Sequence, residues 1–509
     1  MSLNGTNSRA PDLAVIVLLV AAVLLLFART FGYGWNYDDF MVIVDNPDVR
    51  SWGEFWKDSY QGRPLRELTF LLDHALFGYE PRWWHLQNIF WHALNGMLLY
   101  WLLLQLGLGR LPAFLAAGFF LLHPLQVEVV ASTSHRKDTL AVAASLGSLL
   151  AYLQVYAGRR AWLWGGLALL CYLLALSAKQ TAVLLPVLWL VYERFFLPED
   201  RRLLARPCWA RLLPWGAAAA AIGFLLWLAF GGGWGLYLES TGYLLAKVQD
   251  FSEPSVGGYL RLLLTAWSFM ALRIAWPADL AVEYLLPPSV GWGSPWVLAG
   301  LLLVAGILAA FVVAWRRGLA LPVLAGSWIF LLWAPTANLF PFALAYPAAD
   351  RYLYSVLLGV GILLAWGGER LCRSQGLLLA IGGVALFALF LLGWRQVPVW
   401  ASEESVYLHA LEVSPGNSIV LNELGKIAEK RGDAAGAMAY YRAAVEASPR
   451  NVAAHYNLGQ VYERAGFMDR ALEHYQLFLL DNSPDYQETA RVLAERLRRE
   501  RGVIFKGRP

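Results

Sequence analysis

Long apolar runs constrain the fold of this chain more than any other feature. Runs of about 18 or more residues recur along roughly the first 400 positions, separated by polar loops. About 20 residues of helix cross the ~30 Å of hydrocarbon in a bilayer. Only 15% of the 509 residues are charged, whereas soluble domains carry about one quarter. The sequence therefore predicts an all-α fold, a polytopic membrane helix bundle of about 11 spans. The predicted spans are 12–31, 86–107, 111–127, 138–157, 161–177, 181–197, 212–230, 295–315, 319–338, 352–368 and 376–394.

Composition excludes several other classes of protein. A net charge of +4 is too small and too dispersed to indicate nucleic-acid binding, and 24 Trp and 23 Tyr fit aromatic belts at two membrane interfaces. Cys171 lies in an apolar run, and Cys208 and Cys372 flank Arg-rich segments, so no disulfide framework is expected. The run 12–31 is long and no small-x-small cleavage site follows it, which indicates an uncleaved first span.

Positive charge in short loops predicts the orientation, because Lys and Arg concentrate on the cytoplasmic side. If all of the short Arg-rich loops are placed in the cytoplasm, the N-terminus is cytoplasmic and the C-terminus is outside. The run 258–277 carries Arg261 and Arg273, and we interpret it as an interfacial or re-entrant helix. The alternative is that it spans and that one later run does not. The cytoplasmic set is Arg110, Arg159, Arg160, Arg201, Arg202, Arg206, Arg211, Arg316, Arg317, Arg370 and Arg373.

After about residue 400 the chain becomes charged and repeats with a period of 34. Leu424-Gly425 recurs as Leu458-Gly459, and Tyr441 recurs as Tyr475, which is the tetratricopeptide pattern. We predict a membrane domain over 1–398 and an extracytoplasmic tetratricopeptide-repeat domain over 399–509 that ends in a capping helix. Its two and a half repeats bury little core alone, so the array is expected to lean on the membrane domain. Its concave groove is predicted to bind extended peptide through Asn422, Lys426, Tyr456 and Gln460.

Asp38 and Asp39 follow the first span directly, in an aromatic-rich loop on the predicted outer side. Adjacent carboxylates raise each other's pKa, so crowding them at a membrane surface calls for a compensating role. A base at the bilayer face is the functional interpretation. The alternative is that they cap a helix or face solvent.

A second polar segment, His123 to Asp138, falls on the same predicted side. Glu128 and His135 are seven residues apart and would share one face of a helix. Glu128 needs a partner in its apolar surroundings, and an ion pair with Arg136 or Lys137 is one interpretation. Two adjacent cations beside a membrane also favour a phosphate ligand.

Later loops add cations to this side. Lys179 occupies a tight turn, and Asp350-Arg351 opens a later span. The alternatives are snorkelling of Lys179 to lipid headgroups and interfacial anchoring by Arg351. His92 and Asn95, inside the second span, are expected to form helix–helix hydrogen bonds.

A carboxylate base beside outward-facing cations suits cleavage of a sugar–phosphate bond in a lipid carrier. Preplaced cations stabilise the phosphate as it gains negative charge. The carboxylate takes the proton of an acceptor hydroxyl that attacks the anomeric carbon, and in-line displacement inverts the sugar.

The order of these motifs resembles a known family. Tyr37-Asp38-Asp39, Arg63-Pro64-Leu65, His123-Pro124, Arg136-Lys137-Asp138 and Arg351-Tyr352-Leu353-Tyr354, followed by tetratricopeptide repeats, are similar to the TMTC-like O-mannosyltransferases. That family has the GT-C fold. The resemblance implies a polyprenyl-phosphate sugar donor, Ser or Thr acceptors on extracytoplasmic protein, and an inverting mechanism.

Carried onto this chain, the resemblance implies roles for individual residues. Asp38 or Asp39 would be the catalytic base. No cofactor is required, because mannosyltransferase relatives need none; oligosaccharyltransferase relatives use a divalent cation at comparable acids, which makes Asp38 and Asp39 the ligands of a metal alternative. The donor phosphate would be held by Arg136, Lys137, Lys179 and Arg351, with Arg63, His123, Glu128, His135 and Asp138 in support.

We therefore predict an integral membrane glycosyltransferase of the bacterial inner membrane or an equivalent membrane. It would move a hexose such as mannose to protein, with the active site and repeats extracytoplasmic. The alternatives are a transferase with a lipid or polysaccharide acceptor, and a non-catalytic membrane scaffold whose repeats recruit partners.

Overall fold

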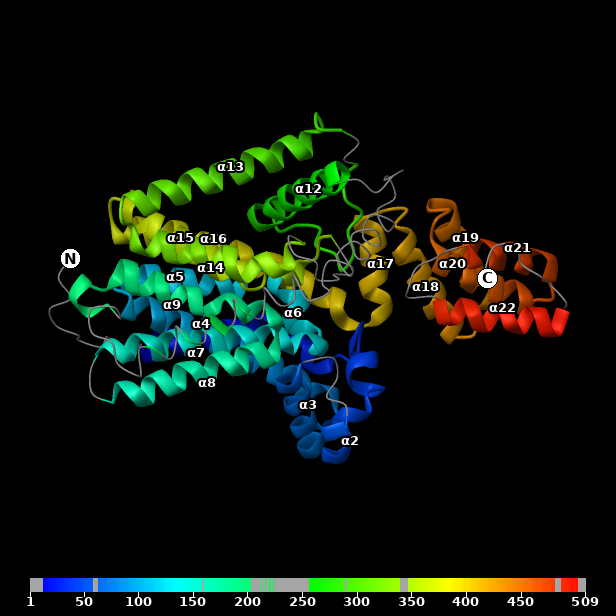
Figure 1. Ribbon diagram of the computed structural model, residues 1–509, viewed down its shortest axis with the longest axis horizontal. Coiled ribbons are helices and arrows are strands. Elements are labelled where there is room, and N and C mark those ends of the chain that lie inside the picture. Colours follow the sequence, from blue (N-terminus) through cyan, green and yellow to red (C-terminus); the bar gives the residue numbers. More distant parts are fainter. Residues whose placement is uncertain are drawn as a thin grey trace.

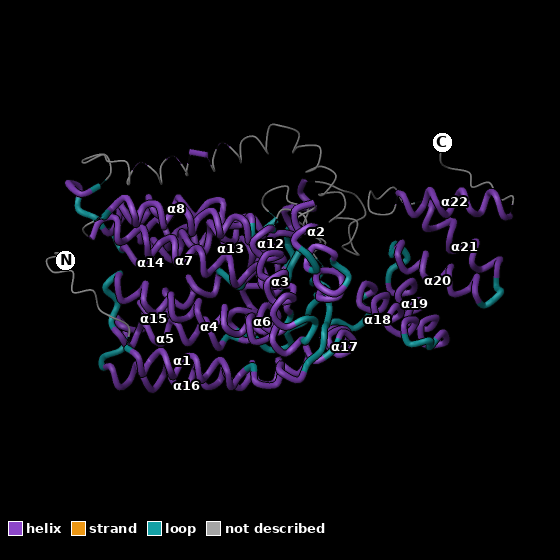
Figure 2. Tube along the Cα trace, turned by 90° about the horizontal axis from the view of Figure 1, so that it is seen from below, coloured by secondary structure: helices purple, strands orange, loops and turns teal. Residues whose placement is uncertain are grey.

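Helices account for all the regular secondary structure of the described residues (Figure 2). The computed structural model describes residues 12–57, 63–157, 160–202, 256–288, 291–338, 347–480 and 487–501, with a few isolated positions between 203 and 255. The predicted span 212–230, apart from such isolated positions, and Cys208 lie outside the described residues.

Apolar helices that run side by side form the body of the molecule (Figure 1). Among the described residues, four helices are long and apolar enough to cross a membrane, and a fifth arises if α5 and α6 are one span bent by 52°. These helices confirm the predicted all-α membrane fold, whereas the count of eleven crossings stays a prediction. The helices of this body are α1 (Leu13–Leu26), α4 (Pro81–Gln105), α5 (Arg110–Leu122), α6 (Val127–Ala131), α7 (Arg136–Ala157), α8 (Ala161–Ala178), α9 (Leu185–Phe196), α12 (Val256–Ala275), α13 (Pro295–Arg316), α14 (Ala320–Trp333), α15 (Val356–Leu371) and α16 (Gln375–Gln396).

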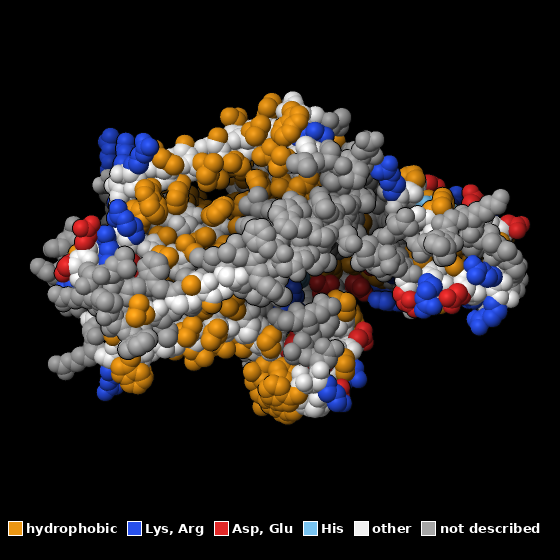
Figure 3. Space-filling view, viewed as in Figure 1, with side chains coloured by type: hydrophobic (Ala, Val, Ile, Leu, Met, Phe, Trp, Pro, Cys, Tyr) orange, Lys and Arg blue, Asp and Glu red, His pale blue; other side chains and the backbone are white. Residues whose placement is uncertain are grey.

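The outside of this body is apolar, as a lipid solvent requires. Leu302 is 74% exposed and Ile307 57% exposed on α13, and Val384 is 71% exposed on α16. Figure 3 shows hydrophobic side chains spread over the helical body, with Lys and Arg gathered at its far end from the repeats. In a membrane these apolar surfaces are in contact with lipid and not with water, so burying them between helices gains no hydrophobic free energy. Tight packing and polar contacts therefore hold the bundle together.

The loops divide between two ends of the bundle. At one end Arg110 forms an ion pair with Asp12 at 3.3 Å, and Gly109 lies against Glu369 at the end of α15. At the other end the short helical turns η5 (Pro124–Gln126), η7 (Gln180–Leu184), η9 (Ala334–Thr336), η10 (Asp350–Leu353) and η11 (Val397–Ala401) contact one another or neighbouring helices. The loops predicted to face opposite sides of the membrane therefore lie at opposite ends.

Two shorter helices belong to the first loop of the second end. α2 (Trp52–Lys57) and α3 (Pro64–Phe77) project from the side of the bundle near the repeat domain (Figure 1). Pro64 occupies the first position of α3, where its missing N–H costs no hydrogen bond.

The segment 258–277, predicted to be interfacial or re-entrant, is the continuous helix α12, and it packs against α13. Gly300 of α13 lies directly against the backbone of Leu264. α12 is not among the long apolar helices of the described residues. Whether it spans therefore stays a prediction.

The repeat domain follows the predicted period. α18 (Ser418–Lys430) and α20 (Val452–Arg464) begin 34 residues apart, and each is followed by a second helix, α19 (Ala434–Ala447) or α21 (Met468–Leu479). Gly425 leaves room for the ring of Tyr441, and Gly459 leaves the same room for Tyr475. α22 (Gln487–Arg501) packs against α21 as the predicted capping helix.

The half repeat joins the membrane helices in one core. Val406, Tyr407 and Ala410 of α17 (Glu403–Val413), with Leu424 of α18, share a continuous buried cluster with the bundle. The two full repeats and α22 share a separate core around Tyr441 and Tyr475. The array therefore leans on the membrane domain, as predicted.

A substitution at Gly300 tests the α12–α13 contact. A Cβ there would lie 2.3 Å from the Leu264 carbonyl oxygen, so Gly300→Ala is expected to destabilise the fold by about 1–3 kcal/mol through overpacking. On the same helix, Gly306→Ala meets nothing within 4 Å and gains helix propensity, so it should be neutral or stabilising. Thermal unfolding in detergent measures both. Equal melting temperatures for the two variants would contradict the contact.

Candidate active site

The Asp38–Asp39 motif lies in a strained turn. Tyr37 has a φ of +49°, in the left-handed region that a bulky side chain rarely adopts. The Asp39 N–H donates to the Asn36 carbonyl oxygen at 2.9 Å, and Asp39 Oδ2 accepts from the Asn36 N–H at 3.3 Å. Such a conformation persists only where surrounding contacts hold it.

The two carboxylates have different surroundings. Asp39 is fully buried, and its Oδ1 accepts the Ser134 N–H at 2.7 Å and the Ser132 hydroxyl at 3.3 Å. Burial raises the pKa of Asp39 to about 6, and the hydrogen bonds from Ser134 and Asn36 act in the opposite direction. Asp38 is partly exposed, within electrostatic range of Lys137 and Arg351. Asp39 therefore holds the loop in place, and Asp38 is the carboxylate left to meet a substrate.

A break in the helix receives Asp39. α6 ends at Ala131, Ser132 is extended (φ −94°, ψ 121°), and a 3₁₀ turn, η6 (Thr133–His135), leads into α7. The expectation that Glu128 and His135 share a face of one helix is therefore wrong. The break turns the Ser134 N–H toward Asp39 instead.

His135 lies at the centre of a cationic cluster. Arg63, Lys137, Lys179 and Arg351 are all within electrostatic range of its ring. The side chain is fully buried, and neither ring nitrogen has a hydrogen-bond partner in the described part of the chain. Its ring stacks on Tyr37 at 6.1 Å. A buried imidazole without partners is costly, so this position is suited to a polar ligand.

Two of the predicted phosphate-binding cations are paired with buried acids. Arg351 Nη1 donates to Glu128 at 2.6 Å, and the Arg351 N–H donates to the same carboxylate at 3.0 Å. Lys179 forms an ion pair with Asp138 and is 14% exposed. These contacts contradict lipid snorkelling by Lys179 and interfacial anchoring by Arg351. The ion-pair partner of Glu128 is Arg351, not Arg136 or Lys137.

The structure does not place Arg136 at the phosphate. Its guanidinium pairs with Asp73 and also donates to Asn88 Oδ1 at 2.8 Å and to the Trp84 carbonyl oxygen at 3.1 Å. The side chain is fully buried, with Phe70 and Trp84 against its face. Arg136 therefore joins α3, α4 and α7, and the prediction that it binds phosphate is corrected.

Lys137, the next residue, is the cation without a carboxylate partner in the described ranges. It is 9% exposed and faces Arg63, Arg66, Asp138 and Asp38 at longer range. It also lies in the first turn of α7, where the helix dipole disfavours a cation and favours an anion. An anion bound at this position would relieve both costs.

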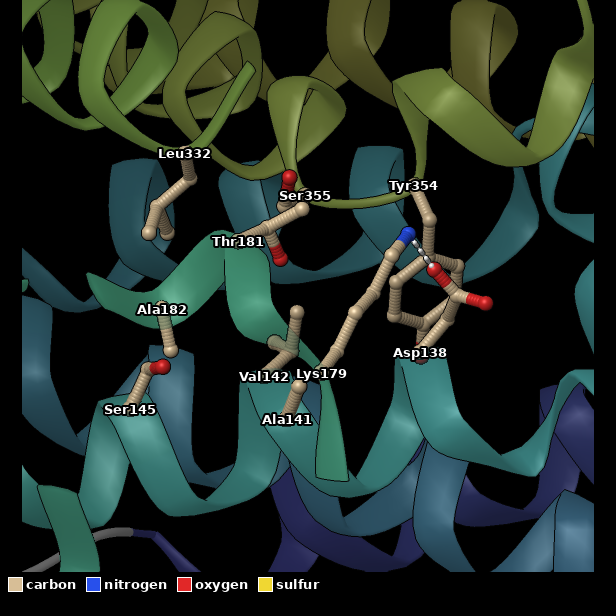
Figure 4. Close-up of a pocket in the computed structure, with 10 residues that line it drawn as sticks. All are labelled: Asp138, Ala141, Val142, Ser145, Lys179, Thr181, Ala182, Leu332, Tyr354 and Ser355. Atoms are coloured by element: carbon tan, nitrogen blue, oxygen red, sulfur yellow. Dashed lines mark hydrogen bonds and ion pairs between the residues drawn. The ribbon is translucent and has the colours of Figure 1, made fainter. Parts of the chain in front are cut away.

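A small cavity opens beside the Lys179–Asp138 pair (Figure 4). Its volume of about 20 Å³ holds about one water molecule and is too small for a sugar. Ser145, Thr181 and Ser355 add hydroxyl groups to a lining that is otherwise largely apolar, and Asp138 Oδ2 has no hydrogen-bond partner in the described residues. A water there would satisfy that oxygen.

The remaining predicted residues have structural contacts. His123 caps η5 through Nδ1 and contacts the Ile274 carbonyl oxygen through Nε2 at 3.1 Å. As expected, His92 and Asn95 make helix–helix hydrogen bonds, and both contact the hydroxyl of Tyr354 at 2.9 Å.

The four predicted groove residues lie on α18 and α20, the first helices of their repeats. Asn422 accepts from Asn457 at 2.9 Å, which links the two helices. Lys426 pairs with Glu423 at 2.7 Å, and Gln460 donates to the Tyr456 hydroxyl at 2.9 Å. Their role in peptide binding stays a prediction.

The residues do not fit the metal alternative well. Both oxygens of Asp39 accept hydrogen bonds from the protein, which leaves Asp38 as the free carboxylate of the pair. Within the described ranges, no group of three or more His, Cys, Asp or Glu is placed to hold an ion. A divalent cation would require further oxygen ligands.

Sequence reasoning missed several residues that build the site. Asp73 and Asn88 hold Arg136, and Ser134 holds Asp39. A signal for Asn88 exists, because the polar residues His85, Asn88, His92 and Asn95 recur every three or four positions in α4 and so share one face. No comparable pattern marks Asp73.

Fold and site together define a polytopic helical membrane protein with an acid–cation site at the end that carries tetratricopeptide repeats. The tetratricopeptide repeat family model matches residues 405–452 and 422–486. The chain is 24% identical to protein O-mannosyl-transferase Tmtc3 of Drosophila melanogaster over 86% of its length, and 27% identical to human protein O-mannosyl-transferase TMTC1 over 84%. These matches confirm the resemblance to the TMTC-like proteins.

The chain spans 56% and 54% of those two relatives, or about half the length of each. Among solved structures, ArnT from Cupriavidus metallidurans bound to undecaprenyl phosphate aligns with a TM-score of 0.37 and 16% identity. The alignment covers 88% of this chain and 79% of that one.

Neighbouring substitutions separate the two cations at the start of α7. Arg136→Gln leaves Asp73 buried without its partner and is expected to cost about 3–5 kcal/mol of unfolding free energy. Lys137→Gln removes a buried cation that has no ion pair, so the melting temperature should stay the same or rise. Differential scanning fluorimetry in detergent measures both. Similar losses for the two variants would contradict the assignment of Arg136 to structure.

Asp39 is expected to make stability depend on pH. Its carboxyl has a pKa of about 6 in the folded chain against 3.8 for the free group. Ionisation therefore destabilises the folded state as pH rises through this window, and the effect is absent below it. Relative to Asp39→Asn, the wild type should lose up to about 3 kcal/mol between pH 4 and pH 6.5. Melting temperatures of both proteins across this range measure the trend, and a constant difference would refute it.

Proposed function

We propose that this chain is an inverting glycosyltransferase that moves a hexose from a polyprenyl-phosphate carrier to Ser or Thr hydroxyls of extracytoplasmic protein. The convergence of Asp38 with Lys137 and Arg351 carries this proposal. These residues come from three segments far apart in the sequence. Lys137 and Arg351 lie within electrostatic range of the buried ring of His135, which has no hydrogen-bond partner in the described residues, and Asp38 lies within range of both cations.

Asp38 is the base of the proposed reaction. It is the exposed carboxylate of the pair, held by a turn that Asp39 anchors through Ser134. As the acceptor oxygen attacks the anomeric carbon, its proton passes to the Asp38 carboxylate. A new bond forms between the anomeric carbon and the acceptor oxygen, and the bond to the phosphate oxygen breaks on the opposite face. Because the acceptor oxygen attacks from the face opposite the leaving phosphate, the anomeric centre is inverted.

The cations stabilise the departing phosphate. The electron pair of the broken bond stays on the phosphate oxygen, so the leaving group gains one negative charge. Lys137, which has no ion pair in the described part of the chain and lies at the N-terminus of α7, is the first contact for that charge. Arg351 and Lys179 are held in place by Glu128 and Asp138 and need little reorganisation. Contacts that strengthen as charge develops favour the transition state over the bound donor.

The relatives support the choice of sugar and acceptor. Both are named protein O-mannosyl-transferases, and the matches cover 86% and 84% of this chain. The repeats lie at the same end of the bundle as Asp38. We place this end outside the cytoplasm, because the Arg-rich loops lie at the other. The groove residues of α18 and α20 would then present an acceptor segment to the site.

Removal of the base tests the proposal. Asp38→Asn keeps the shape of the side chain but cannot take a proton, so transfer should fall by about 10²–10⁴-fold. Asp45→Asn is the matched control, because Asp45 is an exposed acid a few residues further along the same loop. Mass spectrometry of hexose on periplasmic proteins, in cells that express each variant at equal level, measures the loss.

The outcome distinguishes the alternatives. If Asp38→Asn modifies proteins as well as Asp45→Asn does, Asp38 is not the base. Hexose that is lost from lipid or polysaccharide rather than from protein would identify the other acceptor class. A chain that transfers no sugar in any form would be a scaffold.

A further inference from the structure

The catalytic turn is held from the far end of the chain. Asn36, the first residue of the turn, is fully buried, and its side-chain amide donates to the Trp400 carbonyl oxygen at 2.8 Å. The ring of Tyr37 meets Trp400 edge-on at 6.1 Å and Tyr407 at the same distance and a tilt of 55°. Two consecutive residues before Asp38 therefore contact residues more than 360 positions away.

These contacts come from the start of the repeat domain. Trp400 lies in η11, a kinked turn after the last apolar helix, and Tyr407 lies on α17, the half repeat. Trp400 is 2% exposed and Tyr407 6%, so both rings are anchored in the core. One further contact joins the first loop to the repeats: Lys430 of α18 lies over the ring of Phe40 at 5.8 Å.

The backbone of the turn needs this support. A left-handed conformation at a bulky residue such as Tyr37 is unfavourable and is kept only where neighbours enforce it. His135 stacks on one side of the Tyr37 ring, and Trp400 and Tyr407 contact it from the repeat side. Without the repeat-side rings, the turn is free to relax and the Asp38 carboxylate moves with it.

We infer that the half repeat completes the active site, and that Trp400 and Tyr407 are positioning residues for Asp38. The inference rests on the proposed function. In this arrangement the repeats do more than recruit an acceptor, because their first helix sets the geometry of the base. A displacement of about 1 Å in a reacting group lowers a rate by about 10²-fold. The cations proposed to hold the donor phosphate include Lys179 and Arg351, which are fixed by Asp138 and Glu128 and not by either ring.

Side-chain substitutions in the full-length protein test this role. Tyr407→Leu removes the ring and should lower transfer from a polyprenyl-phosphate mannose donor by about 10–100-fold. Affinity for undecaprenyl phosphate, measured separately by calorimetry in detergent, should change less than about twofold. Tyr407→Phe keeps the ring and should retain at least half of the wild-type rate. Leu408→Ala, at a 40% exposed position on the same helix, is the control.

A second variant distinguishes a loss of positioning from a folding defect. Trp400→Phe keeps an aromatic edge and the backbone carbonyl, and its rate should lie between those of Tyr407→Phe and Tyr407→Leu at an unchanged melting temperature. Wild-type rates in both Tyr407→Leu and Trp400→Phe would overturn the inference. So would an equal loss of transfer and of undecaprenyl phosphate binding in Tyr407→Leu, since that result marks general collapse of the site.

Asp38→Asn, assayed in parallel, tells the two claims apart: if it is inactive while Tyr407→Leu is fully active, the positioning role fails and the proposed function stands. If both are fully active, the proposed function fails as well.

Discussion

The contact between Asp39 and the helix break at Ser132–Ser134 is the constraint on which the site depends. One buried carboxylate accepts a backbone N–H and a hydroxyl from a segment 93 and 95 residues away. An unpaired N–H at Ser134 would be costly in this buried position, and so would the carboxylate without donors, so each group needs the other. The contact places the first loop against the start of α7, and it brings Asp38 within electrostatic range of Lys137.

The cluster around His135 shows how a membrane protein keeps many charges at the edge of an apolar body. Arg136, Lys179 and Arg351 each pair with a buried acid, and these acids come from α3, α7 and α6. Breaking any one pair leaves a buried charge alone, which costs more than the pair contributes. The pairs therefore fix geometry more than they add stability. Lys137 and His135 differ, because their buried polar groups have no such partners in the described residues.

Sequence periodicity predicted the tetratricopeptide repeats and the apolar helices. It did not predict the roles of residues whose contacts come from distant parts of the chain. The register of the repeats follows from Gly425 and Gly459, since only glycine admits the rings of Tyr441 and Tyr475. The apolar runs predicted the helix bundle because each run by itself is long enough to cross a membrane. Arg136 and Lys137 are neighbours of the same charge, and nothing local distinguishes them. Their roles diverge because Asp73, 63 residues earlier, meets one and not the other. Likewise, the left-handed backbone of Tyr37 has no sequence signature, because tertiary contacts impose it.

The first helices of the repeat array and the strained turn depend on the same packing. α17 and α18 share a buried core with the membrane helices. The turn at Tyr37 lacks a favourable backbone conformation, and the same packing supplies the rings that hold it. α17 therefore lies at the turn in the folded protein. This coupling supports the Asp38 loop without a dedicated element, and it ties the integrity of the site to the integrity of the repeat domain.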